Sequence, residues 1–160
     1  MSSTDTIVAL SSGAPPSGVA VIRLSGPKTG DLLQEIAGPL PEQRKLVLRP
    51  IGQQSLLDRG LVAWFPAPHS FTGEDCAELQ VHGSPAGVRA ILGLLIGKGA
   101  RLAEAGEFTR RAFENGKLDL VEIEGLGDLL EAETENQRRQ ALARFEGGLS
   151  RRIDHWRDQL

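Results

Sequence analysis

The segment CAELQVHGSP, residues 76–85, constrains the fold more than any other part of the chain. Its first seven residues alternate between two faces, and the apolar face carries Ala77, Leu79 and Val81. A period of two is typical of a β-strand that is buried on one face only. After a glycine come Ser84, a favoured N-cap residue, and Pro85, which is favoured at the first position of a helix. The sequence therefore predicts a half-buried strand that runs directly into a helix.

Glu78 lies on the polar face of this strand, together with Cys76, Gln80 and His82. A carboxylate in such a place can accept two parallel hydrogen bonds from an edge that carries an N–H and an amino group, as in a pterin or a guanine. The same alternation occurs in any half-buried antiparallel strand, whose polar face normally contacts water. From the residues alone, Glu78 is either a ligand-binding carboxylate or an ordinary solvent-facing side chain.

Other strands and helices surround this segment. Residues 19–25 are nearly all apolar, which is compatible with a strand covered on both faces, and Arg23 interrupts the run. Shorter strands are predicted at 6–10, 45–51 and 61–65; Pro50 favours a sheet edge for the second, and a turn at 58–60 precedes the third, so that the two form a hairpin with a long connection. Apolar residues at helical spacing predict helices that begin after Pro27 and after Ser84.

The pattern changes near Asp119, because only helical signals follow it. A short helix is predicted at 107–114, and Asn115-Gly116 ends it. Asp119 with Glu122, and Thr134 with Gln137, match the reciprocal capping box that begins a helix. We therefore predict an α+β domain at residues 1–118, with a mixed or antiparallel sheet and flanking helices, followed by an α-helical segment at 119–160.

An apolar stripe is predicted to continue along the last helix to the final residue. Its members are Leu142, Phe145, Leu149, Ile153, Trp156 and Leu160. Each large side chain that is fully buried contributes about 1.5–3 kcal/mol, so leaving this stripe in water forfeits much of a small domain's stability. We expect the segment either to dock on a second copy of the chain or to fray.

The composition limits the class of protein. With 160 residues, 40% of them hydrophobic and 24% charged, the chain is long enough for a domain with a real core. A formal net charge of -3 argues against general electrostatic binding of nucleic acid. Cys76 is the single cysteine, which rules out an internal disulfide, and the three histidines have no metal-site spacing. Without a basic leader or a run of roughly 18 apolar residues, we expect a soluble, cytoplasmic chain that does not enter a membrane.

Three charged residues stand out because each follows or lies in structure that holds it in place. Arg23 ends an apolar strand, Glu78 lies on a half-buried strand, and Lys117 follows the Asn-Gly helix stop. Two cations and one anion can hold a ligand that carries both a donor edge and carboxylates. Spacing along the sequence does not bring the three together in space.

At these residues the chain resembles the N-terminal part of the tRNA-modifying GTPase family known as MnmE or TrmE. The motifs that carry the resemblance are DTIVAL (5–10), GVAVIRLSGP (18–27), SFTGEDCAELQVHGSP (70–85), AGEFTRRAFENGKLDL (105–120) and the acidic helical run at 121–135. The resemblance implies a folate-binding and dimerising first domain, similar in architecture to aminomethyltransferases, and then the opening of a helical domain. It also implies that Arg23, Glu78 and Lys117 contact a tetrahydrofolate derivative, 5-formyltetrahydrofolate.

Members of this family act with a flavin-dependent partner protein to modify the wobble uridine of certain tRNAs at carbon 5, and the folate supplies a one-carbon unit. GTP, magnesium and potassium are expected only in the GTPase domain, whose motifs this chain lacks, so catalysis by the chain itself is left open. Two alternatives remain. One is a dimerisation module without a ligand, and the other is a stand-alone folate-dependent one-carbon transferase.

Overall fold

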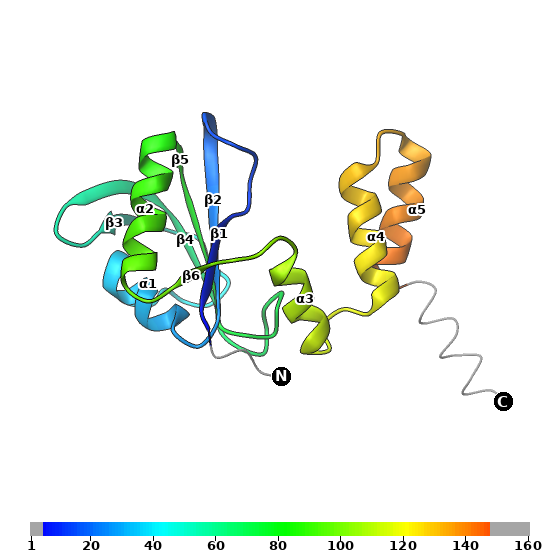
Figure 1. Ribbon diagram of the computed structural model, residues 1–160, viewed down its shortest axis with the longest axis horizontal. Coiled ribbons are helices and arrows are strands. Elements are labelled where there is room, and N and C mark those ends of the chain that lie inside the picture. Colours follow the sequence, from blue (N-terminus) through cyan, green and yellow to red (C-terminus); the bar gives the residue numbers. More distant parts are fainter. Residues whose placement is uncertain (1–4, 148–160) are drawn as a thin grey trace. The chain divides into compact units, whose positions relative to one another are not determined.

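The computed structural model describes residues 5–147, which fall into two compact units, with the boundary along the chain between Glu114 and Asn115. The first unit is a six-stranded sheet with three helices (Figure 1). The second unit contains α4 (Leu120–Glu131) and α5 (Glu135–Phe145), which pack against each other. The predicted α+β class is confirmed.

The sheet has the strand order β3-β4-β5-β2-β1-β6. The strands are β1 (Ile7–Leu10), β2 (Ser17–Ser25), β3 (Val47–Gly52), β4 (Leu56–Phe65), β5 (Cys76–Gly83) and β6 (Arg101–Leu102). The β1–β6 pairing is parallel and the others are antiparallel, so the sheet is mixed. β2 and β5 are neighbours in its interior, and their register sets Arg23 opposite Glu78. β3 lies at an edge, as its proline predicted.

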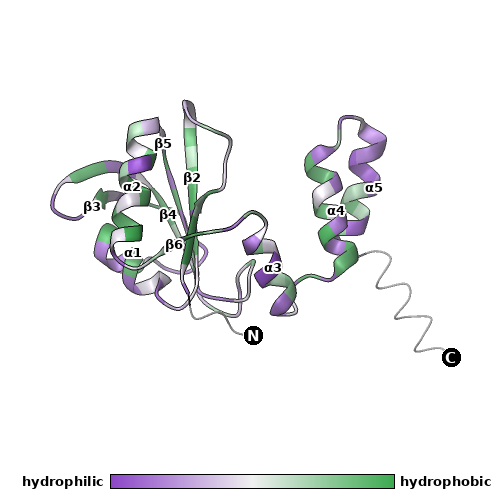
Figure 2. Cartoon of the chain, in the orientation of Figure 1, coloured by the Kyte–Doolittle hydropathy of each residue, from purple (hydrophilic) through white to green (hydrophobic). Residues whose placement is uncertain are grey.

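Helices α1 (Thr29–Ala37) and α2 (Pro85–Gly97) pack on the sheet, and Figure 2 shows apolar residues along both helices and along β2. The core between them includes Ile22 and Leu79 from the two interior strands. On the other face of β2, Val19 is 57% exposed. Cover on both faces, which the apolar run at 19–25 allowed, is therefore not found, because the core takes up only alternate residues of the strand.

The predicted helix starts are confirmed by their hydrogen bonds. Ser84 Oγ accepts from the backbone N–H of Gly87 at 3.3 Å, and Pro85 is the first residue of α2. Asp119 and Thr134 each form a complete capping box, at the starts of α4 and α5. These elements follow the sequence closely because side-chain capping depends on residues only three positions apart.

The predicted β3–β4 hairpin is found, but its predicted connection is wrong. Residues 58–60 lie inside β4 and form no turn, so β3 and β4 are joined by a short hairpin loop. A Cβ atom on Gly60 would lie 2.5 Å from the backbone oxygen of Gln80, so glycine is needed here for close strand approach rather than for a turn. In addition, β6 was not predicted, because two residues are too few to show a period.

The last helix of the described residues is shorter than the apolar stripe predicted. α5 ends at Phe145, and Gly147 has a φ of 71°, which ends a helix readily because glycine adopts the left-handed region without strain. Leu142 and Phe145 are half-buried in the second unit. The rest of the predicted stripe lies outside the described residues.

Candidate functional site

Arg23 and Glu78 form an ion pair on the sheet face opposite the helical core. The Arg23 guanidinium donates through Nε and Nη2 to one carboxylate oxygen, Glu78 Oε1, at 3.0 and 2.8 Å. The side chains are 31% and 23% exposed, so both charges remain in reach of solvent. This contact follows directly from the β2–β5 register, in which the two residues are opposite each other. Two of the three predicted site residues are thus adjacent.

Two phenylalanine rings lie beside this arginine. The guanidinium carbon of Arg23 is 5.7 Å from the centre of the Phe71 ring and 5.8 Å from that of Phe108. Both distances are within the range of cation–π attraction. Phe71 belongs to the loop before β5, and Phe108 belongs to α3 (Glu107–Glu114). Neither aromatic residue was predicted, because no sequence pattern reports a contact between segments so far apart.

A buried cluster of charges lies next to the rings and ties α3 to the sheet. Arg111 is 2% exposed and donates to Glu74 Oε2 at 3.0 Å, to Glu107 Oε1 at 3.1 Å and to the Asp5 carbonyl at 2.8 Å. Glu107, 1% exposed, also accepts from Arg101 Nη2 at 2.7 Å. The acid and base at positions 107 and 111 are a visible i, i+4 signal in the sequence, but that spacing says nothing of their burial.

The environment of Glu107 strongly favours its ionised form. Hydrogen bonds from Arg101, from the backbone N–H of Glu104 and from Arg111 lower the pKa of Glu107 to about 2, although burial acts in the opposite direction. The carboxylate is therefore charged at every pH in which the protein is expected to work. A buried, ionised and fully paired group of this kind holds its neighbours in one arrangement.

The cluster continues into hydroxyl and thiol groups of β2 and β5. Ser25 Oγ donates to Glu74 Oε2 at 2.6 Å and lies 2.7 Å from Thr72 Oγ1, which in turn lies 3.1 Å from Cys76 Sγ. Cys76 is 4% exposed, although its strand position predicted the polar face. That face is covered at this end by the loop before β5, where Cys76 Sγ contacts the hydroxyls of Thr72 and Ser25.

Lys117 belongs to the second unit, just beyond the boundary, and its side chain is exposed. The structure describes the two units separately, so it brings Arg23 and Glu78 together and assigns Lys117 no place beside them. The predicted three-charge site is therefore represented in the first unit by its arginine and its acid.

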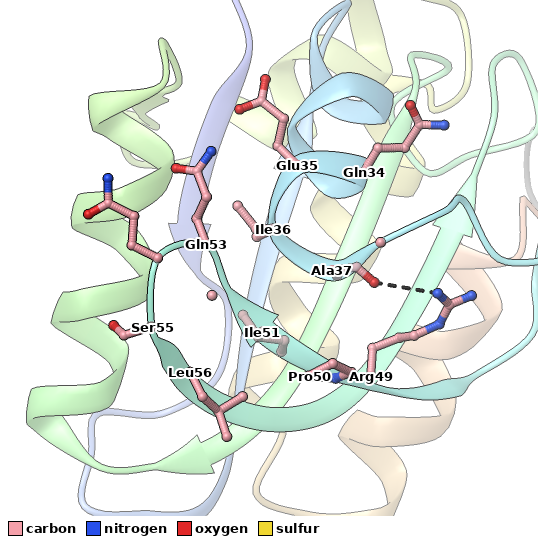
Figure 3. A pocket seen from close by; sticks show the side chains of 13 residues that line it. Gln34, Glu35, Ile36, Ala37, Arg49, Pro50, Ile51, Gln53, Ser55 and Leu56 are labelled. Atoms are coloured by element: carbon pink, nitrogen blue, oxygen red, sulfur yellow. Dashed lines mark hydrogen bonds between the residues drawn. The ribbon is translucent and has the colours of Figure 1, made fainter.

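The hollow in Figure 3 lies elsewhere on the first unit. Its volume is about 460 Å³, and it lies between the end of α1 and the β3–β4 hairpin. Arg49 Nη1 donates there to the carbonyl of Ala37 at 3.5 Å. None of Arg23, Glu78 and Lys117 lines this hollow. Concavity alone thus does not identify the candidate site, which is defined by its ion pair and its two rings.

Comparison with known proteins identifies the family. The profile described as "GTP-binding protein TrmE N-terminus" matches residues 6–117, a span that contains the sheet, the ion pair and Lys117. The chain belongs to this family. Among the helices within residues 5–147, none has the length and apolar character needed to cross a membrane.

Curated TrmE relatives resemble the chain over nearly all of its length. It is 59% identical to the "tRNA modification GTPase MnmE" of Sinorhizobium medicae, in an alignment that covers 100% of the chain and 37% of the relative. The proteins of that name from Maricaulis maris and Granulibacter bethesdensis are 57% and 53% identical, over 97% and 96% of the chain and 36% of each relative. The chain thus spans little more than a third of the relatives that it matches.

Proposed function

We propose that this chain holds a reduced folate, of the 5-formyltetrahydrofolate type, for tRNA modification at carbon 5 of the wobble uridine. The observation that carries the proposal is the way in which the two carboxylate oxygens of Glu78 are hydrogen-bonded. Arg23 donates to Oε1 only, and within residues 5–147 no donor bonds to Oε2. A carboxylate with one oxygen held by an arginine and the other without a donor in residues 5–147 can accept from the N–H and amino edge of a pterin.

The residues present fit such a ligand in charge and in character. Because Arg23 pairs with Glu78, a neutral donor edge can approach the carboxylate without meeting an unpaired charge. The rings of Phe71 and Phe108 add apolar surface beside the pair, which suits a flat heterocycle. When bound, the folate supplies the one-carbon unit, and the protein supplies binding and orientation.

Lys117 completes the proposed site as a cation for carbonyl or carboxylate oxygens of the folate. The family profile extends to this residue, which supports its inclusion. A lysine is suited to the role because its ammonium group pairs with oxygens from many directions on a flexible stem.

We further propose that two copies of the chain pair through the open face of the sheet. One row of paired residues crosses four strands of this face. It consists of Leu48 on β3, Leu61 on β4, Gln80 on β5 and Val21 on β2. Leu48 is 65% exposed and Leu61 is 37% exposed. Exposed apolar side chains gathered on one face favour association with another protein surface. Light scattering tests this idea: a dimer that Leu48→Glu converts to a monomer supports it, and a monomeric wild type contradicts it.

The remaining parts of the proposed reaction belong outside this chain. Relatives named tRNA modification GTPase are about three times as long, because the matched part is 37% of their length. We place GTP, magnesium and potassium in a GTPase domain of the full-length protein, and tRNA and a flavin-dependent protein among its partners. The setting is the cytoplasm, where the buried thiol of Cys76 stays reduced.

Calorimetric titration of the chain with 5-formyltetrahydrofolate tests the proposal. Saturable binding that Glu78→Gln weakens, and that Glu42→Gln leaves unchanged, supports it, because Glu42 forms only an exposed pair with Lys45. A wild type that dimerises but does not bind the folate favours the dimerisation module instead. One-carbon transfer by the chain without a partner protein favours the stand-alone transferase.

A further inference from the structure

The Arg23 guanidinium is held on a single oxygen of Glu78, and the ion pair alone does not account for this geometry. Both side chains are partly exposed, and an exposed ion pair gains little because holding two long side chains in one geometry costs entropy. An arginine in this place would sample several rotamers if only the carboxylate restrained it. A site that presents one oxygen of Glu78 to a ligand requires the guanidinium to remain on the other.

The two aromatic rings supply the missing restraint. Phe71 and Phe108 contact the guanidinium from two different segments, at 5.7 and 5.8 Å from their ring centres. Each attraction adds to the ion pair because it favours the same position of the charge. The rings and the carboxylate therefore favour the same arrangement of the guanidinium.

The buried charge cluster connects the two segments that carry the rings. Glu107 immediately precedes Phe108 on α3, and Glu74 follows Phe71 in the same loop. Arg111 bonds to both of these acids. One buried guanidinium thus ties the segment of one ring to the segment of the other.

We propose that Phe71 and Phe108 are positioning residues that keep Arg23 on Oε1 of Glu78, so that Oε2 is presented to the folate. The proposal rests on the proposed function for its consequence in binding, but the alignment itself is a property of the chain without ligand. It predicts that the aromatic character of position 108 matters, beyond its size or its apolar surface.

The first experiment uses no ligand. In NMR spectra of the ¹⁵N-labelled chain, the Arg23 Nε–H resonance is expected to show ring-current displacement and slow exchange with water. Phe108→Leu should reduce both features, because only the Phe71 ring and the Glu78 carboxylate then remain beside the guanidinium, and Phe108→Tyr should retain them. Phe113→Leu is the matched control, because Phe113 lies on the same helix and is 44% exposed. An Arg23 resonance that is unchanged in Phe108→Leu would overturn the proposal.

The second experiment measures affinity for 5-formyltetrahydrofolate by calorimetry. Phe108→Leu is expected to weaken binding by about threefold to tenfold, as loss of one cation–π contact implies, while Phe108→Tyr stays near wild type. Phe71→Leu provides an independent variant should Phe108→Leu fail to fold. Equal losses in the leucine and tyrosine variants would overturn the proposal, because they would indicate packing alone. A wild type that shows the NMR features but no folate binding contradicts the proposed function and leaves the alignment intact.

Discussion

Arg23 and Glu78 are opposite each other in the central strand pair, and two nitrogens of the arginine donate to a single oxygen of the acid. The asymmetry matters, since a bidentate pair would occupy both oxygens of the carboxylate. Here the arginine pairs with the acid through one oxygen, and within residues 5–147 no donor bonds to the other. This geometry supports a ligand-binding role for a residue that the sequence pattern alone leaves ambiguous.

Glu78→Gln should weaken binding of 5-formyltetrahydrofolate by roughly ten- to hundredfold, because a charge-assisted hydrogen bond contributes about 1.5–3 kcal/mol. The amide keeps the shape of the side chain but loses the charge and part of the acceptor capacity. Calorimetry measures the affinity, and thermal unfolding checks that the domain remains folded. Equal affinity in the variant and the wild type, at unchanged stability, would reject the role of Glu78.

Arg23→Ala should also reduce the affinity for the folate. Its removal takes away a cation of the proposed site and leaves Glu78 without the donor that orients it. We expect a loss of about tenfold or more, with little change in unfolding free energy because the pair is partly exposed. Arg49→Ala is the control on the same sheet, since Arg49 lines the separate hollow. Normal folate binding by Arg23→Ala would show that the ion pair is not part of a folate site.

Lys117→Ala tests whether the second unit contributes to binding. The residue is exposed, so the substitution should leave the melting temperature nearly unchanged. If its ammonium group contacts folate oxygens, affinity should fall by roughly tenfold and the loss should shrink at high salt. Should Lys117→Ala and Arg23→Ala both bind the folate normally, the three-charge site is wrong.

Acid should weaken the attachment of α3 in a definite pH window. The pKa of Glu107 is about 2 in the folded chain, against 4.5 ordinarily, so its contribution is complete above about pH 4.5 and is lost as the pH falls toward 2. The contribution is on the order of 3 kcal/mol. Urea unfolding should therefore show a difference in unfolding free energy between the wild type and Glu107→Gln that is large at pH 6 and smaller at pH 3.

Glu135→Gln is the control for this pH experiment. Arg138 and Arg139 also lower the pKa of Glu135 to about 2, but those partners are exposed. Any loss of unfolding free energy in Glu135→Gln should disappear in high salt, whereas the loss in Glu107→Gln should persist because Glu107 is buried. A loss in Glu107→Gln that is independent of pH would contradict the ionic role of the cluster.

Gly60→Ala should destabilise the sheet by about 1–3 kcal/mol, because the added methyl group meets the backbone of β5 and the chain must shift. The nearest atom, the Gln80 backbone oxygen, would lie only 2.5 Å away. Gly13→Ala is the control, since nothing lies within 4 Å of a Cβ atom at that position. Urea denaturation measures both, and equal stability of the two variants would show that β4 and β5 can separate at no cost.

The parts of the structure that depend on neighbouring residues were predictable. Alternation defined β5, and the capping residues Ser84, Asp119 and Thr134 marked the helix starts, because in each case the interaction spans only a few positions. The same local logic failed at Gly60. A glycine in a sequence predicts a turn as readily as a close approach of strands, and only the partner strand distinguishes the two.

The candidate site was predictable in its residues and not in its geometry. Arg23 was identifiable because it interrupts an apolar strand, and Glu78 because it lies on the polar face of a half-buried strand. The family motifs contain both residues. Phe71 and Phe108 carry no such mark, since half-buried phenylalanines are common. Nor does the sequence indicate that Arg111 is buried, because arginine on a short helix is usually exposed to solvent.

The order in which the chain is synthesised gives the β2–β5 pairing a further consequence. Arg23 leaves the ribosome 55 residues before Glu78, so β2 first has only β1 beside it, and its other edge stays unpaired while β3 and β4 are made. Long-range strand pairing forms slowly, and an unpaired apolar strand is prone to aggregate meanwhile. The α4–α5 hairpin, whose contacts are local, has no such delay. A nascent chain stalled before β5 therefore leaves one edge of β2 unpaired, which makes this stage of translation the one at which a chaperone is most needed.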